Sequence, residues 1–267
     1  NLYSFHIPEN VTSIGAGAFM NCIFKSIEIP KKVTRIEDSL LSYCSLLKSV
    51  ILLGNITFIG YHGFYKCEKL TEIDIHETVT HIGRYAFGIC TSLTNIKIPS
   101  KVTIIEDYLF YKCNKLELIE ILGDVSSIGD GSFSGCNKLK SLIIPENVTS
   151  IGSSTFSECH SLQSIIMPNK IIKIEYKTFY ECIKLETVDL LSEIISIGNN
   201  AFQNCQNLVS IVIPDSVVSI GTYAFGDCAN LLNIKIPSNV TRIEHHQFYG
   251  CENLENIYIN GNIQAID

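Results

Sequence analysis

The sequence contains no tryptophan, only two methionines and no long apolar run. A helix that spans a bilayer needs about 18 or more consecutive apolar residues, so none is expected, and no charged start followed by an apolar stretch resembles a signal peptide. A basic excess is also missing, because 27 acidic residues outnumber 20 basic ones and the formal net charge is -7. Nucleic acid and anionic membrane surfaces are therefore not expected as partners.

Recognisable catalytic motifs are missing as well. The seven histidines include no HExxH pattern, and the adjacent His245 and His246 would diverge on a helical turn. Gly129, Gly131 and Gly135 have neither the dinucleotide-binding spacing nor a Gly-Lys-Ser/Thr ending. We therefore predict no enzymatic activity and no cofactor.

What the sequence does contain is a strict repeat. Eleven cysteines occur at intervals of 23 residues, except that the first interval is 22. A fixed period of this length predicts a solenoid in which each unit buries its apolar face against its neighbours. With 46% hydrophobic residues, the chain is expected to form a single solenoid domain over residues 1–267. Because it begins inside a repeat, we interpret it as a fragment of a longer protein.

Aligned on the cysteine, the unit reads L-x-x-I-x-I-P-x-x-V-T-x-I-G-x-x-A-F-x-x-C. The alternation of residues such as Ile96 and Ile98 predicts a short strand with one buried face, which the following proline ends. Ile105, Leu109 and Cys113 have helical spacing behind a potential capping residue. The expected fold class is therefore α/β, with a stacked parallel sheet and short helices or turns on the opposite side. The capping candidates are Asp38, Asp107, Asp130, Ser153, Asn199 and Thr222.

The run IPxxVTxIGxxAFxxCxxLxxI, seen from Ile7 and again from Ile213, resembles the BspA-like leucine-rich repeat of bacterial and protozoan surface proteins. The resemblance covers the whole chain. It implies a right-handed solenoid whose strands stack in a parallel sheet, and a location at the cell surface or outside the cell. It also implies adhesion to host proteins such as fibronectin and fibrinogen, and no catalysis.

A longer period overlies the short one. Residues 95–106 read NIKIPSKVTIIE and residues 233–244 read NIKIPSNVTRIE, so ten of twelve letters agree 138 positions apart. Glu replaces the repeat glycine every 69 residues, which indicates that blocks of repeats were duplicated. Because Glu rarely tolerates a positive φ, the glycine position is not expected to require one. These residues are Glu37, Glu106, Glu175 and Glu244.

The column of cysteines has three possible interpretations: disulfides with one thiol left over, zinc ligands, or buried free thiols. Stacked neighbours lie within bridging range, but their Cβ vectors run parallel, which is unsuitable for a disulfide. No unit supplies a second ligand at a constant inward place, so no metal is expected. We predict eleven reduced, buried thiols that behave as small apolar residues.

The residue between the two inward isoleucines of each strand points outward and forms the central column of the sheet face. This column is Glu28, Ile51, Asp74, Lys97, Glu120, Ile143, Ile166, Asp189, Val212, Lys235 and Tyr258. A contiguous apolar patch with a polar rim indicates protein recognition, although strands favour Ile and Val on either face. The candidate partner-binding residues are Ile143, Ile166, Leu118, Leu122 and Leu191, with Glu120 and Asp189 as the rim.

Three functions remain open at this point. The chain is a surface adhesin that binds host or neighbouring-cell proteins, a structural spacer that displays another domain, or an intracellular protein-interaction scaffold. Four Asn-x-Thr sequons fit glycosylation of a secreted eukaryotic protein, and they equally fit a repeat consensus that contains Val-Thr. They therefore do not separate the three functions. The sequons start at Asn10, Asn55, Asn147 and Asn239.

Overall fold

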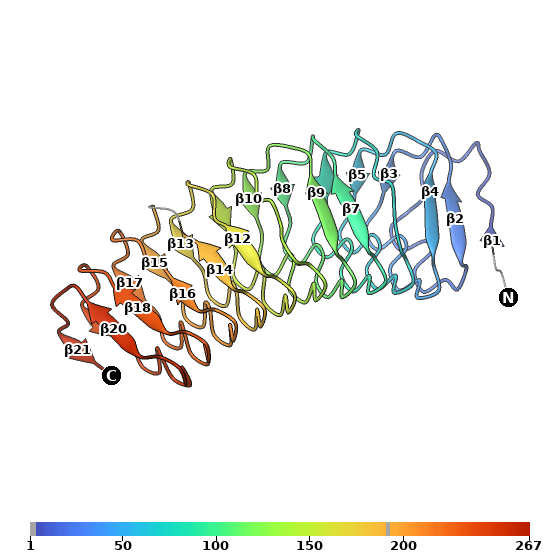
Figure 1. Ribbon diagram of the computed structural model, residues 1–267. Helices are drawn as coiled ribbons and strands as arrows, with labels where there is room; N and C mark the ends of the chain where they lie inside the picture. Colours follow the sequence, from blue (N-terminus) through green and yellow to red (C-terminus); the bar gives the residue numbers. More distant parts are fainter. Residues whose placement is uncertain (1–3, 191–192) are drawn as a thin grey trace.

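The computed structural model describes residues 4–190 and 193–267. The chain winds as a solenoid whose coils follow one another in a bent, twisted stack, with the two termini at opposite ends (Figure 1). Two ladders of short parallel strands run along this stack. The predicted solenoid with parallel strands is therefore confirmed.

The first ladder is formed by the strands that the Ile-x-Ile pattern predicts, and it carries the sheet face. Its strands pair in parallel one coil apart, as Ser26 with Ser49 and Asn233 with Asn256 show. The hydrogen-bonded groups are β1-β2-β4, β7-β9, β12-β14 and β16-β18-β20. The members are β1 (Ser4–Phe5), β2 (Ser26–Ile29), β4 (Ser49–Leu52), β7 (Asn95–Ile98), β9 (Leu118–Ile121), β12 (Ser164–Ile166), β14 (Thr187–Asp189), β16 (Ser210–Ile211), β18 (Asn233–Ile236) and β20 (Asn256–Ile259).

The second ladder follows the proline turn and consists of two-residue strands. Each ends in an isoleucine, and most of these isoleucines are buried against the neighbouring coils. The groups are β3-β5-β6, β8-β10-β11, β13-β15-β17 and β19-β21. The members are β3 (Arg35–Ile36), β5 (Phe58–Ile59), β6 (His81–Ile82), β8 (Ile104–Ile105), β10 (Ser127–Ile128), β11 (Ser150–Ile151), β13 (Lys173–Ile174), β15 (Ser196–Ile197), β17 (Ser219–Ile220), β19 (Arg242–Ile243) and β21 (Ala265–Ile266).

The predicted helical turns are not formed: residues 4–190 and 193–267 contain no helix. Each coil closes instead through consecutive tight turns, in which Leu109 N–H donates to Glu106 O (3.3 Å) and Cys113 N–H to Phe110 O (3.0 Å). Tyr108 and Lys112 have φ values of 55°. These two residues lie four positions apart and have a left-handed backbone conformation, which prevents a right-handed helix from continuing. The fold class is thus a β-solenoid, without the α part of the expectation.

The amide groups that a helix would satisfy within itself bind the next coil. Tyr108 N–H donates to Asp130 O at 2.7 Å, and Phe110 N–H donates to Ser132 O at 2.8 Å. Inward residues still recur at spacings of four and three, which is why the sequence pattern looked helical. The turn side is therefore joined along the stack by its own series of hydrogen bonds.

Four of the six predicted helix caps accept a hydrogen bond from the next coil. Asp107 Oδ1 accepts the N–H of Asp130 in the next coil at 2.9 Å. A Cβ on Gly129 would lie 2.6 Å from the Asp107 backbone nitrogen, so the glycine is needed for close approach and not for a positive φ, as predicted. Each Asp or Asn that accepts such a bond lies one coil before a coil that has glycine at the repeat position. The pairs are Asp38 with Gly60, Asp107 with Gly129, Asp130 with Gly152, and Asn199 with Gly221.

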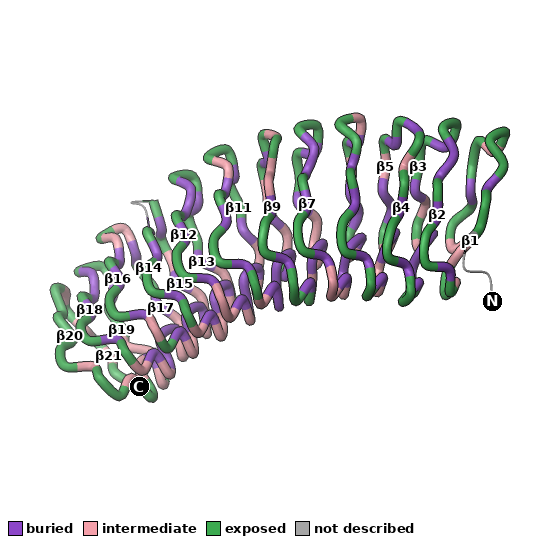
Figure 2. The backbone as a smooth tube through the Cα atoms, turned by 45° about the vertical axis from the view of Figure 1, so that its right-hand side comes forward, coloured by how far each residue is buried: buried purple, intermediate pink, exposed green. Residues whose placement is uncertain are grey.

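Buried residues recur from coil to coil up to Val240 and form one continuous core (Figure 2). Phenylalanine rings stack along it, with 5.8 Å between the centroids of Phe110 and Phe133 and 5.6 Å between Phe133 and Phe156. The cysteines form a second column, in which Cys136 Sγ donates to Phe110 O at 3.3 Å.

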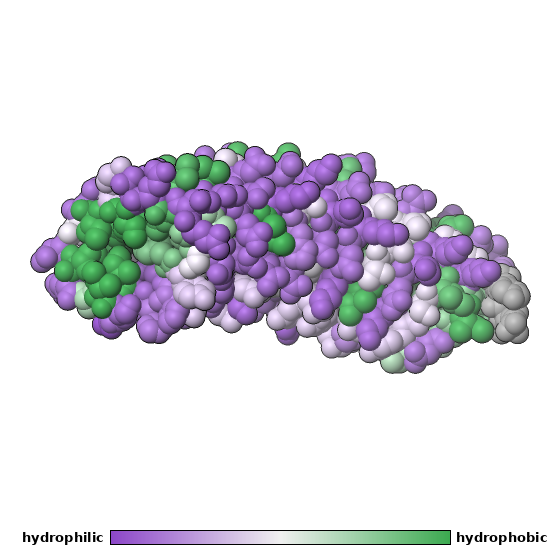
Figure 3. All heavy atoms as spheres, turned by 60° about the horizontal axis from the view of Figure 1, so that its bottom comes forward, coloured by the Kyte–Doolittle hydropathy of each residue, from purple (hydrophilic) through white to green (hydrophobic). Residues whose placement is uncertain are grey.

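All eleven cysteines are free, but Cys22 and Cys251 are only half-buried, so the prediction of eleven buried thiols was wrong for these two. The last coils expose apolar residues in the same way. Ile257 is 42% exposed, whereas its equivalent one coil earlier, Ile234, is 1% exposed. Figure 3 shows apolar surface gathered at this end of the stack. Burial in a solenoid is supplied by the neighbouring coils, and in this structure β20 and β21 pair with β18 and β19 alone.

Candidate protein-binding face

The strand pattern places alternate side chains on the sheet face and in the core. Ile143 is 89% exposed and Ile166 is 66% exposed, while the preceding residues Leu142 and Ile165 are buried. This alternation is what an extended backbone dictates. The residues around Ile143 form no strand, so the first ladder is interrupted between β9 and β12.

Ile143 and Ile166 line one surface hollow of 350 Å³. Met167, which is fully buried, and Pro168 contribute to its wall, and Glu146 lies at it as a charged group. The structure therefore brings together the two isoleucines that the sequence analysis placed at the centre of the candidate site. An apolar hollow beside exposed isoleucines can receive an apolar side chain of a partner.

A second hollow of 660 Å³ lies farther along the same face. Val212, which is 81% exposed, lines it together with Pro214 and Lys235, and Asn169 borders both hollows. The sequence analysis placed Val212 in the outward column but did not include this residue among the candidate binding residues. Asn169 follows a proline turn, and no sequence signal pointed to it.

Leu118 and Leu122 lie one coil before Ile143 and are both exposed. Glu120, between them, is half-buried, and its Oε2 lies 3.2 Å from Lys97 Nζ in the preceding coil. The rim at Glu120 is thus an ion pair and not a free carboxylate. Its contribution to stability is small because both groups contact water.

Asp189 is exposed and pairs in register with Ile166. Its backbone oxygen accepts a hydrogen bond from Met167 N–H at 3.1 Å. Since Val212 follows one coil later, Asp189 lies between two apolar residues of the column and not at its edge. Leu191, the remaining candidate, lies outside the described residues.

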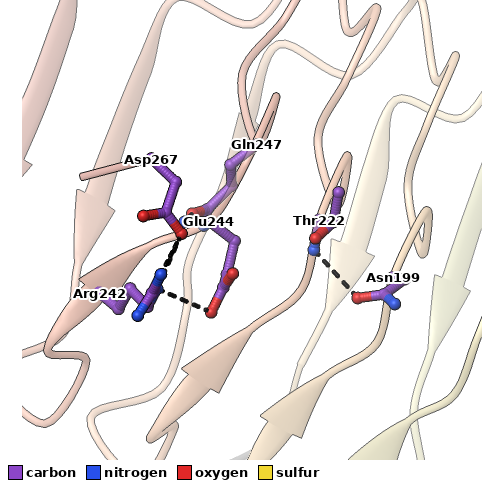
Figure 4. A network of polar contacts seen from close by, with 6 residues as sticks. All are labelled: Asn199, Thr222, Arg242, Glu244, Gln247 and Asp267. Atoms are coloured by element: carbon purple, nitrogen blue, oxygen red, sulfur yellow. Dashed lines mark hydrogen bonds and ion pairs between the residues drawn. The ribbon is translucent and has the colours of Figure 1, made fainter. Parts of the chain in front are cut away.

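The polar contacts of the second ladder hold coils together. Arg242 Nε donates to Asp267 Oδ2 at 2.8 Å and lies 3.6 Å from Glu244 Oε1 (Figure 4). Thr222 N–H donates to Asn199 Oδ1 at 3.0 Å in the same region. The Arg242, Asp267 and Asn199 side chains are thus engaged by neighbouring coils, so the network is a structural link along the stack.

The buried thiols are poorly suited to chemistry. Burial raises the pKa of Cys113 to about 12, because an apolar environment disfavours the thiolate. In residues 4–190 and 193–267, no group of three or more His, Cys, Asp or Glu side chains is arranged to hold a metal ion. The same residues include no helix long and apolar enough to cross a bilayer.

The geometry defines a class of protein: a repeat solenoid with parallel strands and an exposed sheet face. A family model described as the BspA type leucine rich repeat region matches it with six copies over residues 1–90, 57–186 and 172–267. The chain therefore belongs to the BspA-type leucine-rich repeat family. Solenoids of this kind are typically scaffolds for interaction and not enzymes.

Two solved structures of bacterial proteins are similar to the chain. A leucine-rich repeat protein from Bacteroides ovatus has 32% identity and a TM-score of 0.78, with 98% of this chain and 74% of that chain covered. A leucine rich cell surface protein from Faecalibacterium prausnitzii has 28% identity and a TM-score of 0.66, with 97% and 88% covered.

The pneumococcal vaccine antigen PcpA shares the fold at 16% identity and a TM-score of 0.54, with 98% of this chain and 78% of that chain covered. Comparison with curated proteins finds no significant relative. The chain is thus a leucine-rich repeat module of the bacterial surface-protein type.

Proposed function

We propose that this chain is a cell-surface adhesion module that binds a protein through its sheet face. The observation that supports this proposal is the run of Ile143, Ile166 and Val212, exposed on three of four successive coils beside two hollows. Their side chains contribute little to the core, because the inward residues of the same coils fill it. A central apolar cluster with charged neighbours is the usual arrangement of a binding surface.

Host matrix and plasma proteins, with fibronectin and fibrinogen as the first to test, are the proposed partners on the basis of the family resemblance. Affinity for a single module need not be high. When many copies are displayed on a surface, multivalency raises avidity by about 10² to 10⁴ without any new contact.

The test is binding of the purified chain to immobilised fibronectin and fibrinogen by surface plasmon resonance. The double variant Ile143→Asp/Ile166→Asp is expected to bind at least about tenfold more weakly, because two carboxylates would have to be desolvated in an apolar contact. Its unfolding midpoint in urea should match that of the parent, since neither side chain is buried.

The matched control is Ile104→Asp/Ile172→Asp. These two isoleucines are each 46% exposed but lie away from the first ladder, on and beside the second. The control adds the same charge and should leave binding unchanged. Equal binding by the parent and the Ile143→Asp/Ile166→Asp variant would exclude the sheet face as the binding surface. If neither variant changed the attachment of cells, the spacer function would be favoured.

The intracellular scaffold is tested separately. Protease treatment of intact source cells should degrade the repeats if they are displayed outside. Full protection of the repeats in intact cells, with degradation after lysis, would support the scaffold and contradict a surface location.

A further inference from the structure

A second, half-exposed surface lies on the turn side of the solenoid. Seven aromatic rings there form an unbroken chain of contacts over four successive coils, and we name this surface the aromatic belt. Centroid distances include 3.7 Å for Tyr61 to His62 and 4.7 Å for Tyr85 to Tyr108. The belt consists of Tyr43, Tyr61, His62, Tyr65, Tyr85, Tyr108 and Tyr111.

The fold does not require these rings. At the positions of Tyr108 and Tyr111, the next coil has Gly131 and Ser134, and it stacks on its neighbours in the same way. Tyr85 and Tyr108 have φ values of 55°, a conformation that glycine adopts at lower cost and that Gly131 adopts one coil later. Ser154 and Asn200 adopt the same conformation at the equivalent places of later coils, so the backbone does not need an aromatic residue there.

Two lysines border the belt. Lys66 Nζ lies 4.9 Å from the centroid of the Tyr43 ring, and Lys112 Nζ lies 5.2 Å from that of Tyr111. Among the described residues neither lysine has a carboxylate within ion-pair distance, whereas Arg84 is paired with Asp107 at 2.8 Å. Lys112 is also hydrogen-bonded to the Tyr111 side chain, so both cations contact tyrosines and neither is in an ion pair with a carboxylate of the described residues. A partner that carries acidic groups matches this charge.

The way the rings contact one another decides between types of partner. Tyr61, His62 and Tyr65 are stacked, as are Tyr85 and Tyr108, so much of their face area is used within the chain. A nucleic-acid base needs a free ring face. Burial first, and then nearby phenols, raise the pKa of Tyr65 and Tyr85, because both disfavour the phenolate. Ring edges with clustered hydroxyls are typical of surfaces that bind protein.

Coil spacing indicates the shape of that protein segment. The centroids of Phe64, Phe87 and Phe110, which lie beside the belt, are 5.2 and 5.9 Å apart. Two coils thus advance about 11 Å along this column, and three residues of an extended chain cover roughly 9 to 10 Å, so the two repeats agree to within about 2 Å. A polyproline II segment lying along the stack would present the same side every three residues, to Tyr65 and then to Tyr111. Aromatic surfaces favour such segments because little conformational entropy is lost.

We propose that the aromatic belt binds an extended, acidic, proline-rich protein segment, independently of the sheet face. Prolines would pack against the tyrosine edges, and carboxylates would pair with Lys66 and Lys112. The module would then hold two different partners at once.

The experiment measures fluorescence anisotropy of a labelled peptide of repeated Glu-Pro-Pro triplets, with Lys-Pro-Pro and Gln-Pro-Pro peptides for comparison. The parent should bind Glu-Pro-Pro best, and binding should weaken with added salt. The variant Tyr85→Ser/Tyr111→Ser should bind it at least about tenfold more weakly, and Lys66→Gln/Lys112→Gln should remove the preference for Glu-Pro-Pro over Gln-Pro-Pro.

Tyr249→Ser is the matched control, because Tyr249 occupies the place of Tyr111 two blocks later and is 59% exposed. It should leave peptide binding unchanged, as should Ile143→Asp/Ile166→Asp. If Tyr85→Ser/Tyr111→Ser fails to fold, Tyr108→Gly replaces it, since Gly131 shows that glycine fits this conformation. Absence of Glu-Pro-Pro binding, equal binding of Lys-Pro-Pro, or an equal loss in the Tyr249 control would overturn the proposal.

Discussion

Residues 95–106 and 233–244 are nearly identical in sequence but have different surroundings. The inward residues agree: Ile98 and Ile236 are fully buried, and Val102 and Val240 are 1% exposed. The outward residues differ, because Lys97 forms an ion pair with Glu120 whereas Lys235 is in register with Tyr258. The repeat therefore determines the core, and the next coil determines the surface.

The two copies also differ in how well they are covered. Ile105 is fully buried in the middle of the stack, while its equivalent Ile243 is half-buried near the C-terminal end. Identical letters thus do not imply identical contributions to stability. Substitutions at equivalent positions 138 residues apart separate the effect of the residue from that of its neighbours.

The largest effect is expected from high pH. The buried thiols keep a raised pKa in the folded state, about 12 for Cys113, against about 8.5 when unfolded. Their stabilising effect is complete below the unfolded pKa and is lost as pH rises toward the folded one, because only the unfolded chain releases protons. At pH 10 the loss of folding free energy is on the order of 1 to 2 kcal/mol for each fully buried thiol. The losses of the buried thiols add, so their total exceeds the effect of a single substitution.

Urea unfolding between pH 8 and pH 10.5 measures this loss. The variant Cys113→Ala should show a smaller pH dependence than the parent, and Cys251→Ala, at the half-buried equivalent position, should change it less. Equal slopes for all three proteins would contradict the role of burial.

Truncation of a core ring should have the next largest effect. Phe110 is fully buried between Phe87 (5.9 Å) and Phe133 (5.8 Å), so Phe110→Ala should reduce the free energy of unfolding by about 3 to 5 kcal/mol. Phe248, its equivalent, is half-buried and stacks on Phe225 at 6.1 Å. Phe248→Ala should cost clearly less in the same chemical denaturation, and an equal cost would show that position in the stack is unimportant.

Added volume at a repeat glycine should have an intermediate effect. A Cβ at Gly129 would meet the Asp107 backbone nitrogen at 2.6 Å, so Gly129→Ala should destabilise by about 1 to 3 kcal/mol. The equivalent residue two blocks later is Asp267, which has a side chain. At the position that corresponds to Asp107, the preceding coil has His245. Asp267→Ala should change the unfolding free energy by less than about 1 kcal/mol, through its exposed pair with Arg242. A neutral Gly129→Ala would show that the coils can separate at no cost.

The smallest effect belongs to the sheet-face ion pair that only one copy possesses. Glu120→Gln removes the charge opposite Lys97 at a site in contact with water, so the unfolding free energy should change by less than about 1 kcal/mol. Lys235→Gln, in the copy without this pair, is the control. A change of several kcal/mol at Glu120 would mean that the rim is part of the folding core.

The sequence was sufficient for the period, the parallel strands and the direction of each side chain. Ile143 and Ile166 are outward, as the two-residue alternation required, and Leu142 and Ile165 are inward. These features depend on local spacing, which every coil repeats.

The predicted helices failed because spacing does not say where an N–H group bonds. Leu109 and Cys113 point inward in a helix and equally in a series of tight turns. The Tyr108 N–H binds Asp130 O in the next coil, and no single unit contains that information. The aromatic belt has the same origin, since Tyr85 meets Tyr65, Tyr108 and Tyr111 only after the coils stack.

The central claim is that the sheet face around Ile143 and Ile166 contacts a protein. Hydrogen–deuterium exchange of the chain with and without fibronectin or fibrinogen tests it most directly. The account predicts slower exchange over residues 118–122, 141–146 and 164–169, with the turn segments around Tyr85 and Tyr108 unchanged. Exchange that is unaltered by both proteins, or protection confined to the turn segments, would contradict it.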